Sequence, residues 1–110
     1  MDKIAELLHE KGKITEEIAA IASMRKGVLN EQFVTVKLKD GREKIRGPYF
    51  VLTRKGARGK TVSKAIPVSD AEFIRSETEN YKRFRQLADK YVDICEQISE
   101  NLLSDSVKDR

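Results

Sequence analysis

The sequence predicts an α+β fold with an N-terminal helix, a small antiparallel sheet of three or four strands, and a long C-terminal helix. Apolar residues recur at three- and four-residue steps near both ends of the chain, which is the period of a helix. In the middle they alternate with polar residues, which is the period of a strand. Neither glycine nor proline occurs after Pro67, so nothing interrupts the last helix. The length of 110 residues predicts a single domain, residues 1–110.

Residues 1–27 are predicted to form a helical arm. Gly12 interrupts its apolar stripe and Thr15 can cap a new start, so we expect either one kinked helix or two short helices. Gly27 suits the C′ position that ends a helix. The apolar stripe of this arm consists of Ile4, Leu7, Ile14, Ile18 and Ile21.

Residues 28–68 are predicted to form a basic β head. Val34, Val36 and Leu38 alternate with polar residues, as in a strand that has one buried face.

Turn signals divide the β head into strands. Asp40-Gly41 predicts a two-residue hairpin turn, because both of its central positions favour positive φ. A short returning strand, residues 42–46, follows, and Gly47-Pro48 is expected to end it. The loop KGARGK then joins the strand YFVLT to the last strand, TVSKAIP.

This loop ends in Gly59-Lys60-Thr61, which is also the ending of a nucleotide-binding loop. That motif has the pattern G-x-x-x-x-G-K-[ST] and is followed at once by a helix. Here Arg54 stands where the first glycine is required, and a β-branched run follows in place of a helix. We therefore interpret the loop as a basic hairpin tip, and we expect no cofactor and no small-molecule substrate.

Residues 69–104 are predicted to form one long helix, followed by a frayed tail at residues 105–110. A helix of roughly 30 residues is about 45 Å long, and we expect it to pair with the N-terminal arm as an antiparallel stalk. Because its apolar stripe is longer than that arm, we also expect self-association into a dimer. The expected dimer seam consists of Tyr81, Phe84, Tyr91, Ile94, Ile98 and Leu102.

The composition argues against several classes of function. Cys95 is the only cysteine and His9 the only histidine, so a metal site, a catalytic triad and an intrachain disulfide lack the side chains they need. The carboxylates are dispersed along the predicted helices, which provides no acid–base pair. No apolar run is long enough to cross a bilayer, and the N-terminus lacks the apolar segment of a signal peptide. We expect a cytoplasmic protein that is not an enzyme and has no metal or membrane contact.

The net charge of +4 conceals an uneven distribution along the chain. Residues 1–25 carry −1, residues 26–69 carry +8 from eleven basic and three acidic side chains, and residues 70–110 carry −3. This local excess predicts contact with the phosphate backbone of DNA or RNA. The candidate nucleic-acid contacts are Lys37, Lys39, Arg42, Lys44, Arg46, Tyr49, Arg54, Lys55, Arg58, Lys60 and Lys64.

The same residues allow other interpretations. Lysines on strands can simply solvate an exposed face and protect a sheet edge. The protein can also be an adaptor or scaffold that assembles through its helices and docks an acidic partner surface on the β head. Tyr49 and Phe50 can stack on an unpaired base, although burial in a small core is the favoured interpretation for both rings.

Four short motifs occur in order along the chain: MRKGVL at 24–29, RGPYFVL at 46–52, GKTVSKAIP at 59–67 and NYKRFRQL at 80–87. In this set the chain resembles a small, uncharacterised prokaryotic family with the signatures M-R-[RK]-G-x-L, G-P-Y and G-K-T. Many members of that family carry a cysteine-rich, zinc-knuckle-like segment just before G-P-Y, which implies nucleic-acid contact. The corresponding segment here, VKLKDGREKI, contains no cysteine, so the resemblance implies no metal for this chain.

Overall fold

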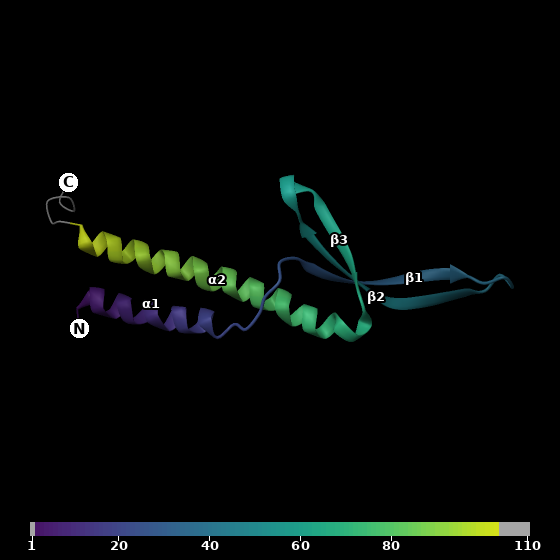
Figure 1. The fold of residues 1–110 in the computed structure, drawn as a ribbon, viewed down its shortest axis with the longest axis horizontal. Coiled ribbons are helices and arrows are strands. Elements are labelled where there is room, and N and C mark those ends of the chain that lie inside the picture. The colour runs from purple at the N-terminus through teal and green to yellow at the C-terminus, as the bar shows by residue number, and fades with distance from the viewer. Residues whose placement is uncertain (1, 104–110) are drawn as a thin grey trace. The chain divides into compact units, whose positions relative to one another are not determined.

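The computed structural model describes residues 2–103 and confirms the predicted α+β order of elements (Figure 1). The tail predicted at residues 105–110 lies outside the described residues. No helix in the described part of the chain is both long and apolar enough to span a membrane. The elements are α1 (Lys3–Ala19), β1 (Val28–Lys37), β2 (Glu43–Lys55), the 3₁₀ helix η1 (Ala57–Gly59), β3 (Thr61–Ile66), the 3₁₀ helix η2 (Val68–Asp70) and α2 (Ala71–Leu102).

The chain divides into two compact units, and the single domain that its length predicts stays a prediction. The helical unit contains residues 1–22 and 82–110, and the sheet unit contains residues 23–81. Each unit has its own apolar core, and the two cores share no residue.

The N-terminal helix is unbroken, so the second helix start that the sequence allows does not occur. The Asp2 side chain caps α1 by accepting a hydrogen bond from the backbone N–H of Ile4 at 3.3 Å. The Thr15 hydroxyl donates to the carbonyl of Lys11 at 2.7 Å, one turn earlier in the same helix, instead of capping a new one. A side chain at Gly12 would meet nothing within 4 Å, so this glycine lies in the helix without a packing role.

The helix ends at Ala19, well before the end predicted at Gly27. Gly27 instead leads into β1, where its backbone has a φ of 127°. A Cβ at this position would lie 2.8 Å from the carbonyl oxygen of Thr53 on the neighbouring strand. The glycine is therefore explained by close approach of two strands and not by a helix cap.

The segment before Gly27 is bonded to α2, which explains why it leaves the helical conformation. The Asn80 amide donates to the carbonyl of Ser23 at 2.9 Å, and the Arg25 N–H donates to the carbonyl of Glu77 at 3.1 Å. The Arg25 guanidinium also forms an ion pair with the buried Glu77 carboxylate, with 3.2 Å between Nε and Oε1. These bonds satisfy backbone groups that a continued helix would have paired internally.

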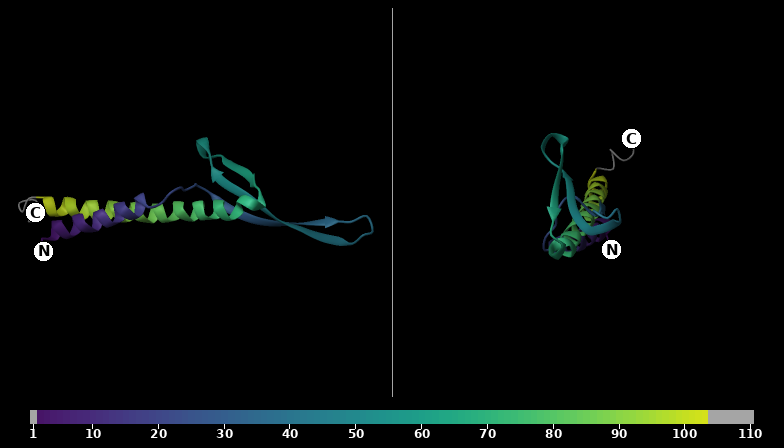
Figure 2. Two further views of the ribbon diagram at one scale, coloured as in Figure 1. Left: turned by 60° about the horizontal axis from the view of Figure 1, so that its bottom comes forward. Right: turned by 90° about the vertical axis from the view of Figure 1, so that its right-hand side faces the viewer.

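In the helical unit, α1 packs against the later part of α2 in the predicted antiparallel direction (Figure 2). Glu17, near the end of α1, forms an ion pair with Arg83 at 3.3 Å. Lys11, earlier in α1, lies over the ring of Tyr91, which is later in α2. The core of this unit consists of Leu7, Ile14, Leu87 and Ile94, with Ile18, Ile21, Tyr91 and Ile98 packed against it.

The sheet has three antiparallel strands in the order β1-β2-β3. The returning strand predicted at residues 42–46 and the strand YFVLT form one strand, β2, so Gly47-Pro48 does not end it. Gln32 pairs with Tyr49 and Val34 pairs with Arg46, so Gly47 and Pro48 together face a single residue of β1. This bulge accommodates a proline, which has no N–H to give to the ladder.

The turn between β1 and β2 is also longer than predicted. The N–H of Leu38 donates to the carbonyl of Arg42 at 2.7 Å, and the N–H of Gly41 donates to the carbonyl of Leu38 at 3.0 Å. Gly41 has a φ of 89°. This is a three-residue loop with glycine in the left-handed position, in place of the two-residue turn expected from Asp40-Gly41.

The core of the sheet unit lies where three strands meet the start of α2. Phe50 and Leu52 of β2 pack there with Ile66 of β3 and with Ala71 and Ile74 of α2. Beyond the bulge, β1 and β2 form a two-stranded ribbon that lacks the predicted buried face. Val36 and Leu38 are only half-buried, and no core residue of α2 covers this part of the sheet. The other apolar side chains of the ribbon are exposed: Phe33 (60%), Val34 (48%) and Ile45 (69%).

Candidate nucleic-acid interface

The predicted nucleic-acid contacts lie on two hairpins of the sheet unit, and all eleven are exposed. The two hairpins share β2 but extend in different directions from the three-stranded part of the sheet (Figures 1 and 2). The first hairpin is the β1–β2 ribbon, which carries Lys37, Lys39, Arg42, Lys44 and Arg46. The second hairpin is the β2–β3 turn with its flanking strands, which carries Arg54, Lys55, Arg58, Lys60 and Lys64.

In the described part of the chain, one of these ten cations forms an ion pair with an acidic side chain. Arg42 forms an ion pair with Asp40 at the tip of the first hairpin, with 2.6 Å between Nε and Oδ2. Asp40 also accepts a hydrogen bond from the Arg42 N–H, so the pair belongs to the turn. Within residues 2–103, no ion pair joins any of the other nine cations to a carboxylate. The positive charge predicted for the β head is therefore accessible on both hairpins.

The tip of the second hairpin is fixed by backbone hydrogen bonds. The N–H of Gly56 donates to the carbonyl of Lys60 at 2.6 Å, and the N–H of Lys60 donates to the carbonyl of Ala57 at 3.3 Å. Arg58 has a φ of 60° and Gly59 a φ of 75°, so both residues take left-handed conformations. The turn thus holds Arg58 in a conformation that costs about 1–2 kcal/mol for a residue with a Cβ.

The two aromatic residues that the sequence groups together have different environments. Phe50 is 9% exposed and lies in the core, as the favoured interpretation predicts. Tyr49 is 48% exposed, so that interpretation is wrong for its ring. Side chains of adjacent strand residues point to opposite faces of a sheet, and α2 covers only the face that carries Phe50. Tyr49 is left available for stacking, with the exposed Phe33 nearby on β1.

Sequence reasoning missed one part of this surface, a hollow of about 430 Å³ beside the second hairpin. Gly27, directly after Lys26, is the signal that could have located it, because an isolated glycine next to a strand often marks a close backbone approach. The hollow is lined by Lys26, Gly27, Val28, Thr53, Arg54, Lys55 and Thr61.

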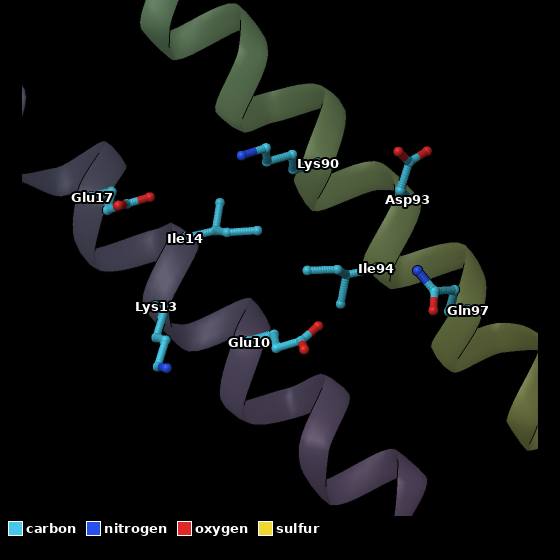
Figure 3. A pocket seen from close by; sticks show the side chains of 8 residues that line it. All are labelled: Glu10, Lys13, Ile14, Glu17, Lys90, Asp93, Ile94 and Gln97. Atoms are coloured by element: carbon cyan, nitrogen blue, oxygen red, sulfur yellow. The ribbon is translucent and has the colours of Figure 1, made fainter.

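A second hollow lies in the helical unit, between α1 and α2 (Figure 3). Glu10, Glu17 and Asp93 line it together with Lys13 and Lys90. Ile14 and Ile94 also line it, and its acidic side chains outnumber its basic ones, so it offers no positive charge in excess to a polyanion.

The expected dimer seam is partly occupied within one chain. Ile94 is buried in the α1–α2 core, and Tyr91 and Ile98 pack against the same core. Leu102, in contrast, is exposed, as are Leu8 and Val92 in the same unit. The apolar surface left for self-association is therefore smaller than the stripe on α2 predicts, and dimerisation stays a prediction.

Within residues 2–103, no group of three or more His, Cys, Asp or Glu side chains is placed to hold a metal ion.

In comparisons with protein-family models, curated proteins and solved structures, no match to this chain is found. The resemblance to a prokaryotic family through four short motifs stays a prediction.

Proposed function

We propose that the protein binds nucleic acid through the two basic hairpins of its sheet unit and catalyses no reaction. The observation that carries this proposal is the exposure of ten basic side chains between Lys37 and Lys64, nine of them without an ion-pair partner in the described chain. Acidic and basic side chains solvate an exposed strand equally well, so solvation alone does not explain an excess of one sign. This stretch contains only two acidic residues, Asp40 and Glu43. The excess of one sign favours a polyanion over simple solvation.

The contacts divide into two kinds. Lysines and arginines on the hairpins neutralise phosphates, which provides affinity that depends little on sequence. The exposed Tyr49 ring stacks on an unpaired base, which adds affinity for single strands.

The single cysteine favours the reducing cytoplasm as the location of the protein.

Charge removal tests this proposal. Two triple alanine variants remove cations from the first hairpin (Lys37, Lys39 and Lys44) and from the second hairpin (Arg54, Lys55 and Lys60). A control variant removes three exposed lysines of the helices (Lys3, Lys13 and Lys90), and its net charge changes by the same amount. Fluorescence anisotropy with duplex DNA, single-stranded DNA and single-stranded RNA measures the affinity of each variant.

We expect both hairpin variants to bind more weakly, because each lost phosphate contact means that fewer counterions are released on binding. Each lost contact should also reduce the slope of log affinity against log salt concentration by about one unit. The control variant is expected to bind nearly as tightly as the original protein. Equal weakening by all three variants would show that net charge, and not the hairpins, determines binding. Failure of the unchanged protein to bind any of the three nucleic acids would refute the proposal.

A further inference from the structure

We infer that the hollow beside the second hairpin binds the terminal phosphate of a nucleic-acid strand, an inference that rests on the proposed function. Its lining contains three basic residues and no acidic one: Lys26, Arg54 and Lys55. Phosphate is recognised by this combination of cations and hydrogen-bond donors. Another hollow of comparable size, between α1 and α2, has three carboxylates in its lining.

Two threonine hydroxyls complete the lining. Thr53 and Lys55 are two residues apart on β2, so their side chains point to the same face of the sheet. Thr61 pairs with Lys55 across the ladder and therefore lies on that face too. The Asn30 amide lies 3.5 Å from Oγ1 of Thr53 in donor geometry, so the threonine oxygen serves as an acceptor there. Its hydroxyl hydrogen is then left to be donated to an anion.

The backbone fixes Lys26 at the edge of this hollow. On one side, the Arg25–Glu77 ion pair and the hydrogen bond from the Arg25 N–H to the carbonyl of Glu77 anchor the chain to α2. On the other side, the close approach of Gly27 to Thr53 brings the chain against β2. The Lys26 ammonium lies 6.0 Å from the centroid of the Tyr81 ring, at the outer limit of a cation–π contact. That contact is weak enough for the ammonium to turn toward a phosphate.

Charge and size favour the end of a strand over its backbone. A phosphodiester carries one negative charge and has a sugar on both sides. The exposed cations along the two hairpins can contact such a group without enclosing it. A terminal phosphate carries up to two negative charges and three free oxygens. These match the Lys26 and Lys55 ammonium groups and the two threonine hydroxyls of the lining, whereas Arg54 alternates to the other face of β2. At about 430 Å³, the hollow has the volume of a small-ligand site, so it accommodates the terminal nucleotide together with its phosphate.

The test compares single-stranded DNA oligonucleotides of one sequence that carry a 5′-phosphate, a 3′-phosphate or only hydroxyl ends. Fluorescence anisotropy with the full chain gives the dissociation constant of each. We expect one phosphorylated oligonucleotide to bind about tenfold more tightly than the hydroxyl-ended one, since hydrogen bonds to charged groups are among the stronger ones. The double variant Lys26→Ala/Lys55→Ala is expected to lose this preference.

A matched double variant in the first hairpin, Lys39→Ala/Lys44→Ala, is expected to weaken binding of all three oligonucleotides and to keep the preference. Inorganic phosphate should shift the amide NMR signals of Thr53 and Thr61 in the unchanged protein and not in the Lys26→Ala/Lys55→Ala variant. Equal affinity for all three oligonucleotides would overturn the inference and leave the proposed function standing. Absence of binding to every oligonucleotide would also overturn this inference, and only a failure to bind duplex DNA and single-stranded RNA as well would refute the proposed function.

Discussion

Tyr49 and Phe50 are neighbours on β2 whose rings meet opposite environments, one half-exposed and the other in the core. Replacing each with alanine therefore separates binding from stability. Tyr49→Ala is expected to weaken binding of single-stranded DNA by about 1–3 kcal/mol, the usual value of one stacked base. Phe50→Ala is expected to lower the free energy of unfolding by about 3–5 kcal/mol, because it empties a core position.

Anisotropy and urea denaturation measure these two quantities. Binding of duplex DNA by Tyr49→Ala serves as the control, since paired bases offer no free face to the ring. Unchanged single-strand affinity in Tyr49→Ala would exclude stacking by this ring.

Two glycines with contrasting surroundings provide a second prediction at the residue scale. Gly27→Ala is expected to destabilise the protein by about 1–3 kcal/mol, because the φ of 127° suits glycine and the new Cβ would meet the Thr53 carbonyl at 2.8 Å. Gly12→Ala is expected to stabilise it by about 0.5–1 kcal/mol, since alanine favours a helix interior and nothing lies within 4 Å. Urea denaturation of both variants checks the prediction, and destabilisation by Gly12→Ala would contradict the continuous α1.

At the scale of elements, the pairing of α1 with α2 depends on a narrow apolar stripe. Leu7 is 2% exposed in the helical core, whereas Leu8, the next residue, is 51% exposed. Leu7→Ala is therefore expected to lower the free energy of unfolding by about 2–5 kcal/mol. The same change at Leu8 is expected to cost less than about 0.5 kcal/mol. Thermal denaturation followed by circular dichroism compares the two variants, and equal effects would contradict the orientation of α1.

The helices and the order of the elements could be predicted from the sequence, because they depend on local signals. These signals are the spacing of the apolar residues and the absence of glycine and proline after Pro67. The end of α1 could not, since it depends on bonds from Ser23 and Arg25 to residues of α2 far along the chain. The continuity of β2 through Gly47-Pro48 was missed for a similar reason. The bulge that accommodates the proline forms only when β1 lies alongside.

In the candidate site, too, features with a local sequence signal could be predicted and features that depend on distant contacts could not. Charge is local in sequence, so the basic residues of both hairpins could be identified, and the structure leaves all of them exposed. The exposure of Tyr49 depends on which face of the sheet α2 covers, and the hollow at Lys26 depends on three segments that meet only in the fold. Neither can be recognised from spacing alone.

At the scale of the whole molecule, exposed apolar side chains predict self-association. Several apolar side chains of the helical unit remain exposed in one chain, among them Val92 and Leu102. We expect a dimer, and we expect Val92→Asp/Leu102→Asp to shift it toward monomer by placing charge in an apolar contact. Sedimentation equilibrium over a range of concentrations measures the mass. A monomer mass that does not change with concentration in the unchanged protein would exclude the dimer.

The distribution of charge along the chain underlies the proposed function, since residues 26–69 carry a net +8 and the flanking segments are acidic. Affinity that arises from phosphate neutralisation depends steeply on salt, because each contact releases condensed counterions. A docking contact with an uncharged or mainly apolar partner has no such dependence.

The most direct test is the salt dependence of binding to duplex DNA, measured by anisotropy between low and physiological ionic strength. If about five phosphates are neutralised, the logarithm of the association constant should fall with the logarithm of the salt concentration with a slope of about −4 to −5. A slope near zero would contradict the assignment of the two hairpins to the phosphate backbone.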